Sequence, residues 1–212
     1  MRAYLFVTVA AVLASSCAAS ADTVTSYSSQ SAFQSASTTT LSDNFPGAAP
    51  GGTYEGQSYA YGPFTYTMAS GNVFIINDVP GYSNSVTSTN ASYIGGDNYP
   101  NAPVTETITF APASAVGFYL GDYFGGESLT ITVDGSVFDY TVPSASGSEI
   151  FAGFTSTGDF TSVTITGTNQ EVDTVQAYYG TSSVTATPEP SSLALLGTTL
   201  LGICGTVKRR FA

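Results

Sequence analysis

The chain has 212 residues with four Lys or Arg, fifteen Asp or Glu and no His, which gives a formal net charge of −11 at pH 7. All the cations stand near the two ends, at Arg2 and at residues 208–210, so the stretch 22–187 has no basic side chain and carries every acid except Glu189. These counts exclude ion pairs, His-based metal sites and His-activated nucleophiles inside the stretch, and they argue against phosphate or nucleic-acid partners, which an anionic surface repels.

The first 21 residues are typical of a secretory signal peptide. Arg2 gives the positive start, residues 4–14 form an apolar run, and the small residues Ala19-Ser20-Ala21 precede the expected cleavage site. We therefore expect an N-terminal signal helix. Lipidation of Cys17 is the alternative, although Leu13 stands four residues before it and a bacterial lipobox has its Leu three residues before the Cys.

The region between the two ends is predicted to be one all-β domain. Short alternating apolar runs are separated by Gly, Pro, Asn and Asp, and no helix pattern is visible. Residues 22–40 are expected to form a Ser/Thr-rich linker or edge strand, and residues 41–183 the domain itself. We predict an antiparallel two-sheet β-sandwich, because the runs lack the fixed period of a β-helix. The expected strands are 64–68, 73–76, 107–110, 116–120, 129–133, 138–142, 150–154, 160–166 and 172–179.

Two further features bear on the stability of this domain. Asp134-Gly135 stands between two alternating runs and predicts a tight hairpin, since both residues tolerate positive φ. Cys17 and Cys204 are the only cysteines and both lie in the end segments, so we expect no disulfide in the domain. About 160 residues are nevertheless enough to bury a core.

The C-terminal segment combines three parts in a fixed order. A linker over 184–190 ends in the triplet Pro188, Glu189 and Pro190, and the uncharged residues 191–207 follow. That run is at the short end of what spans a bilayer, so we expect a single transmembrane helix there. The tail 208–212 begins with Lys208, Arg209 and Arg210, which the positive-inside rule places in the cytoplasm.

This tail resembles the PEP-CTERM sorting signal of Gram-negative bacteria. The resemblance implies export, anchoring in the inner membrane, processing near the triplet by an exosortase, and transfer to the cell surface or to the extracellular, exopolysaccharide matrix. Tails of this kind also carry the label of an ice-binding protein C-terminus. The threonine runs Thr130-Ile131-Thr132 and Thr164-Ile165-Thr166 could serve ice binding, but Thr is also a favoured residue on the exposed face of any strand.

A looser resemblance covers residues 105–180. The segments TITFAPASAVGFYLGDYFGG, LTITVDGSVFDYTVP, IFAGFTSTGDFTSVTITG and EVDTVQAYYG are similar to β-sandwich ectodomains that accompany such tails, and to galactose-binding-like and carbohydrate-binding jelly rolls. The resemblance implies a structural calcium, with Asp173 as a ligand on the last strand and Asp43 or Asn44 as its partner from the first.

The residues themselves leave the calcium question open. Asp173 alternates with Val175 and Ala177, which predicts an inward-pointing carboxylate, and such a group needs a cation that the domain does not supply. The alternative is that Glu171 and Asp173 simply begin a strand at a wet edge.

The candidate ligand-binding residues are tyrosines in Gly-, Asn- and Ser-rich segments. Tyrosine rings stack on sugars and their hydroxyls donate and accept hydrogen bonds, although such rings also seal loop ends over a core. The candidates are Tyr54, Tyr59, Tyr61, Tyr82, Tyr93 and Tyr99.

The sequence favours an exported, non-enzymatic glycan-binding or adhesion module. A passive coat protein of the matrix is the alternative. The acid pairs Asp122 with Glu127 and Asp134 with Asp139 also allow a glycoside hydrolase, which needs only two carboxylates at the right separation. This is a distant third, because no cationic or Trp sugar platform accompanies the pairs and solvated turns explain them better.

Overall fold

The computed structural model describes residues 22–43, 53–54, 56–76, 93–98, 103–121, 126–144, 148–169 and 171–183. They belong to one compact unit, Asp22–Thr185. The expected signal helix and the expected transmembrane helix lie outside these ranges. Within them, no helix combines the length and the apolar character needed to cross a membrane.

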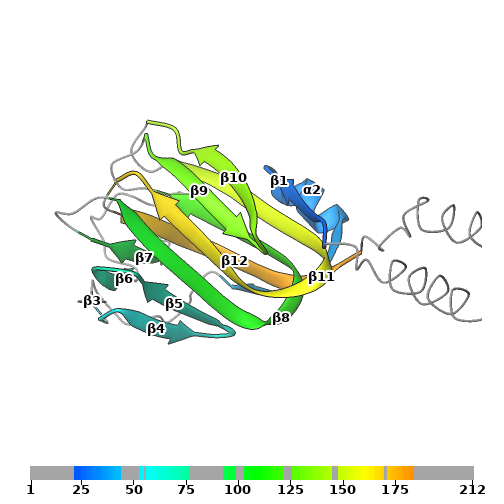
Figure 1. The fold of residues 1–212 in the computed structure, drawn as a ribbon, viewed down its shortest axis with the longest axis horizontal. Helices are drawn as coiled ribbons and strands as arrows, with labels where there is room; N and C mark the ends of the chain where they lie inside the picture. Colours follow the sequence, from blue (N-terminus) through cyan, green and yellow to red (C-terminus); the bar gives the residue numbers. More distant parts are fainter. Residues whose placement is uncertain are drawn as a thin grey trace, which may run out of the picture. The chain divides into compact units, whose positions relative to one another are not determined.

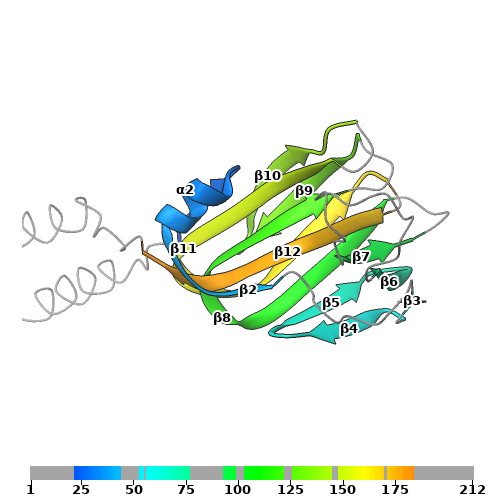
Figure 2. The same cartoon turned by 180° about the vertical axis from the view of Figure 1, so that it is seen from behind.

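The described chain is mostly strand, and every strand pairing in it is antiparallel. The elements in chain order are β1 (Val24–Tyr27), α2 (Gln30–Ser35), β2 (Ser37–Asp43), β3 (Thr53–Tyr54), β4 (Ser58–Tyr61), β5 (Phe64–Met68), β6 (Asn72–Ile76), β7 (Tyr93–Asp97), β8 (Val104–Gly121), β9 (Ser128–Val133), β10 (Ser136–Thr141), β11 (Glu149–Gly167) and β12 (Glu171–Ser182). The long strands β8, β11 and β12 run the length of the domain (Figures 1 and 2).

The strands form two sheets that share β8 and β11. In the first sheet, the order is β10, β9, residues 160–167 of β11, residues 104–110 of β8, β5 and β4. In the second sheet, the order is β1, residues 149–156 of β11, residues 113–121 of β8 and β12. One end of β12 also pairs with β2, and its other end pairs with β7, which is followed by β6 and β3. The pairing of β11 with β8 shifts register between Thr155 and Ser162, at the point where both strands pass from one sheet to the other. Bulges are common where strands change sheets.

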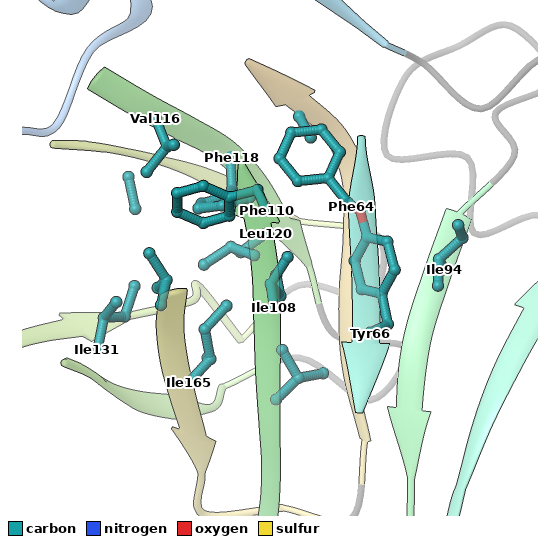
Figure 3. Packing of buried hydrophobic residues seen from close by; sticks show 14 of the residues in the cluster. Phe64, Tyr66, Ile94, Ile108, Phe110, Val116, Phe118, Leu120, Ile131 and Ile165 are labelled. Atoms are coloured by element: carbon teal, nitrogen blue, oxygen red, sulfur yellow. The ribbon is translucent and has the colours of Figure 1, made fainter. Parts of the chain in front are cut away.

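The core lies between the two sheets. Phe64 of the first sheet makes edge-on ring contacts with Phe110, at 6.0 Å between centroids, and with Phe118 of the second sheet, at 6.3 Å. Figure 3 shows the side chains of Phe110, Phe118, Leu120, Ile108, Ile131 and Ile165 gathered between the strands. The prediction of an antiparallel β-sandwich is therefore confirmed for the described residues.

The hairpin between β9 and β10 has the predicted turn. Asp134 has φ 47° and Gly135 has φ 75°, and Val133 pairs directly with Ser136 across the turn. Asp is one of the few residues with a side chain that enters this region readily, and Gly enters it without a steric penalty. Two positive φ values in a two-residue loop match the right-handed twist of the flanking strands.

Residues 22–40, expected as a linker or an edge strand, contain β1, α2 and the start of β2. The Ser29 side chain caps α2 by accepting a hydrogen bond from the backbone N–H of Ala32 (3.4 Å). Phe33 is the buried residue of this helix and packs on the outer face of the second sheet, against Phe151 and Tyr178. Figures 1 and 2 show α2 and β1 at one end of the sandwich, beside β11.

Polar contacts fix the helix to the same sheet. The Gln30 side-chain amide donates to Tyr178 Oη (2.7 Å), and Tyr119 Oη donates to Gln30 Oε1 (3.0 Å). Six residues are too few for a helix that is stable alone, so these contacts and the buried Phe33 ring must hold it in place.

Candidate functional site

Asp173 lies on the outer face of the second sheet. It is 4% exposed and is registered with Gly95 on β7 and Gly121 on β8. A Cβ on residue 95 would come within 2.4 Å of Asp173 Oδ1, so the carboxylate occupies the space above that glycine. The neighbouring pair, Val172 and Gly96, faces the core, since a Cβ on residue 96 would meet Met68.

The expected inward orientation of Asp173 therefore differs from the structure. A register shift between Thr174 and Gln176 interrupts the alternation of β12, so Ala177 faces the core while Asp173 faces outward. A pattern of period two cannot reveal such a bulge, because it counts residues and not strand partners.

The side chains implied as partners of Asp173 lie outside the described residues. Asp43 is registered with Ala177, and its side chain lies outside the described residues, as does all of Asn44. Among the described side chains no group of three or more His, Cys, Asp or Glu residues could hold a metal ion. The calcium site stays a prediction.

Carboxylates nonetheless gather on this outer face. A single registered row runs from Glu149 through Gly121 and Asp173 to Gly95, and the pair Glu171 and Asp97 lies beside it. Burial raises the pKa of Glu149, and burial together with the charge of Glu149 raises the pKa of Tyr119. No basic side chain balances these acids, because residues 22–187 contain no Lys, Arg or His.

Glu106 is a buried acid that the sequence reasoning did not single out. It is 0% exposed, alternates on β8 with the core residues Val104 and Ile108, and is registered with Met68 and Ile165. Neither carboxyl oxygen has a hydrogen-bond partner in the part of the chain that the structure describes. Burial raises the pKa of Glu106 to about 8, so the group is mostly protonated at neutral pH. Its alternation with Val104 and Ile108 was the signal that could have identified it.

Three of the four acids considered for hydrolysis, Glu127, Asp134 and Asp139, lie among the described residues. Glu127 is buried, and its Oε1 accepts a hydrogen bond from the backbone N–H of Asn169 (3.0 Å), whereas Asp122 lies outside the described residues. Asp139 accepts a hydrogen bond from Thr130 Oγ1 (3.0 Å) on the hairpin, and Asp134 forms its exposed turn. Hydrogen bonds involve Glu127 and Asp139, and Asp134 has the positive φ of the turn.

Two of the six candidate tyrosines have described side chains. Tyr59 and Tyr61 on β4 are partly buried and pack against the core between the sheets. The side chains of Tyr54 and Tyr93, and all of Tyr82 and Tyr99, lie outside the described residues. The rings of Tyr59 and Tyr61 thus help to close the core, and a ligand-binding role for them stays a prediction.

The outer face of the first sheet is lined with threonine. On β9, β11, β8 and β5 the residues that alternate with the core are mostly Thr, and none of these side chains is buried. One registered row runs, from β9 to β5, through Thr132, Thr164, Thr107 and Thr67. We call the hydroxyl face the set Thr65, Thr67, Thr105, Thr107, Thr109, Thr130, Thr132, Thr164 and Thr166.

Neighbouring hydroxyls on this face bond to one another across the strands. The Oγ1 atoms of Thr107 and Thr164 are 3.3 Å apart, and those of Thr105 and Thr166 are 3.2 Å apart. Because Thr is also stiff at χ1, the hydroxyls are held in fixed positions. The hydroxyl face is therefore an ordered array of donors, acceptors and methyl groups.

Comparison with known proteins identifies the C-terminal segment. Residues 186–210 match the family model of the PEP-CTERM protein-sorting motif. The chain carries a PEP-CTERM sorting signal. The match includes Pro188, Glu189 and Pro190 and the basic residues 208–210, all of which lie outside the described residues. A search of curated proteins found no match.

The match confirms the prediction that the tail carries a PEP-CTERM sorting signal. It implies an exported protein that an exosortase processes. The described sandwich ends shortly before it: the backbone N–H of Ser183 donates to Ala36 O (3.0 Å), and residues 184–187 lead to the Pro-Glu-Pro triplet. The described sandwich thus directly precedes the sorting signal in the sequence.

Proposed function

We propose that this protein is a non-enzymatic glycan-binding and adhesion component of the cell surface or of the exopolysaccharide matrix. In this proposal a signal peptide exports it, the C-terminal helix holds it in the inner membrane with residues 208–212 in the cytoplasm, and an exosortase then transfers it outward. The hydroxyl face carries the proposal, because it is the broad, ordered polar surface of the described sandwich and points away from the core.

The chemistry of the face supports glycan binding better than catalysis. Hydroxyl groups match sugar hydroxyls as donors and acceptors, and the threonine methyl groups can pack on the apolar faces of sugar rings. The acids considered for hydrolysis are accounted for by local structure where they are described. A passive coat protein remains the second candidate, since a Thr-lined face also suits a soluble sandwich that binds nothing.

The test is a binding measurement on the full chain in a zwitterionic detergent, which avoids competition from glycoside detergents. We expect slower migration in native gels that contain a soluble polysaccharide, and signal on a glycan array. A chain that migrates normally in every gel and gives an empty array is a coat protein, and the glycan-binding proposal is then wrong.

A further inference from the structure

We propose that the hydroxyl face binds a single chain of a neutral polysaccharide, which lies across strands β9, β11, β8 and β5. The inference rests on the proposed glycan-binding function and adds two statements to it. The first is that the threonines of the hydroxyl face form the binding surface. The second is that the ligand is an uncharged glycan.

Charge selects the ligand class. The first-sheet segments of these strands, together with the edge strand β10, carry two acids: Glu106 points into the core, and Asp139 on β10 is exposed and accepts a hydrogen bond from Thr130. The other acids of β11, Glu149 and Asp159, precede its first-sheet residues 160–167. The rest of the domain is anionic, and residues 22–187 hold no cation that could offset the repulsion of an acidic polymer. A neutral glycan carries hydroxyl groups that match the threonine hydroxyls of the face. Because it has no charge, the acids of the domain do not repel it.

The paired hydroxyls keep hydrogen-bonding capacity for a ligand. Within the pair Thr107 and Thr164 one hydroxyl donates to the other, so the accepting hydroxyl keeps its own proton and both oxygens keep lone pairs. The pair Thr105 and Thr166 offers the same set. Because these rotamers are already fixed, binding a sugar loses little side-chain entropy, which is the general advantage of preorganised surfaces.

The geometry favours one flexible chain over a flat lattice. Neighbouring strands are about 4.8 Å apart, so the row from Thr132 to Thr67 spans about 14 Å across the sheet. Adjacent strands are also rotated by about 20–25°, and the row therefore twists by roughly 60–75° over its length. A rigid planar lattice, such as a crystal face, can touch only part of a twisted row, whereas a single polysaccharide chain can follow it.

The experiment compares two double variants of the full chain. Thr107→Val with Thr164→Val removes two adjacent hydroxyls from the face and keeps the side-chain shape and strand propensity. Thr38→Val with Thr181→Val is the matched control, because these residues are an exposed, registered pair between β2 and β12 of the second sheet. Thermal unfolding checks that both variants are folded. The probes are dextran and a mixed-linkage β-glucan as neutral polymers, and alginate as the acidic one.

We expect at least one neutral polymer to bind the unmodified chain and alginate not to bind. The Thr107→Val, Thr164→Val variant should bind the neutral polymer about tenfold more weakly, which corresponds to about 1.4 kcal/mol, and the control variant should bind unchanged. Thr107→Ser with Thr164→Ser should stay near the original affinity, because the hydroxyls remain.

Four results would overturn the inference. If the Thr107→Val, Thr164→Val variant binds as tightly as the unmodified chain, the glycan site is not on the hydroxyl face, but the proposed function still holds. If the unmodified chain binds no polysaccharide, both the site and the proposed function are wrong. Binding of alginate as tight as that of the neutral polymers contradicts the charge argument. Ice shaping or self-association that the same variant alters, without a change in glycan binding, assigns the face to ice or to a second copy of the chain.

Discussion

Phe33 of α2 lies so close to Gly153 of β11 that a Cβ on residue 153 would come within 2.8 Å of the Phe33 ring. Gly117 on the neighbouring strand β8 makes a similar approach, at 3.3 Å from the same ring. The helix can therefore dock on the second sheet because the two strands beneath it have no side chain there. Both glycines belong to the sheet, and Phe33 is 1% exposed between them.

Replacement of Phe33 or Gly153 should loosen this contact. Phe33→Ala should lower the free energy of unfolding by about 3–5 kcal/mol, as for other buried aromatic rings. Gly153→Ala should also destabilise the domain, because the new Cβ would stand 2.7 Å from Phe151 and 2.8 Å from Phe33. Urea unfolding of the single and double variants measures the coupling. In the Phe33→Ala background Gly153→Ala should cost less, and strictly additive effects would contradict the packing described here.

The segment around Phe33 also shows where sequence reasoning reaches its limit. Alternation identified the central strands, since one face of each is apolar and a strand has period two. The helix α2 has six residues with a single buried one, which is too short for a helical period to be visible. Its position depends on Gly117 and Gly153, which are more than 80 residues away in the sequence, so the contact could not be derived locally.

The candidate sites also differ in whether their residues are contiguous in the sequence or are brought together only by strand pairing. The sorting tail was found because its triplet, apolar run and basic cluster are contiguous. The threonine rows were visible only as separate runs, because register between β9, β11, β8 and β5 is set by long-range pairing. The orientation of Asp173 depends on a bulge near residue 175, and no residue pattern marks it.

Glu106 should make the domain less stable as the pH rises. Burial raises its pKa from 4.5 to about 8, so between these values the folded chain holds a proton that the unfolded chain releases. The stabilising contribution of the protonated group is complete below about pH 4.5 and is lost as the pH rises through about 8. Glu106→Gln removes the titration. The difference in melting temperature between this variant and the unmodified chain should shift in favour of the variant between pH 5 and pH 9.

A second variant separates this titration from the loss of a polar group. Glu106→Leu removes both the charge and the polar atoms and should unfold at a higher temperature than the unmodified chain at pH 9, provided that the leucine fits. Circular dichroism at pH 5, 7 and 9 provides the melting curves. A constant difference between the unmodified chain and Glu106→Gln across this range would show that Glu106 does not titrate there.

The β9–β10 turn allows a test of backbone conformation without packing effects. Gly135 has φ 75° and a Cβ there would meet nothing within 4 Å, so Gly135→Ala changes strain alone. We expect a loss of about 1 kcal/mol, the usual penalty for a side chain in the left-handed region. Asp134→Asn should be neutral or slightly stabilising, because Asn-Gly is favoured in this turn, whereas Asp134→Val should destabilise it. The urea concentrations at the unfolding midpoints rank the stabilities of these variants. Equal stability of Asp134→Val and Asp134→Asn would contradict the assigned turn.

Calcium binding is the remaining expectation from the jelly-roll resemblance, and Asp173 provides its test. If Asp173 holds an ion together with Asp43 or Asn44, calcium at 100 times its dissociation constant should raise the stability of the full chain by about 2.7 kcal/mol. Chelation should reverse the gain, and Asp173→Asn should remove most of it. Asp139→Asn is the matched control, because Asp139 is an exposed acid of the first sheet. Melting curves in millimolar calcium and in chelator measure the response. Identical curves for the unmodified chain in the two buffers would leave Asp173 as a buried acid of the outer face with no calcium to hold.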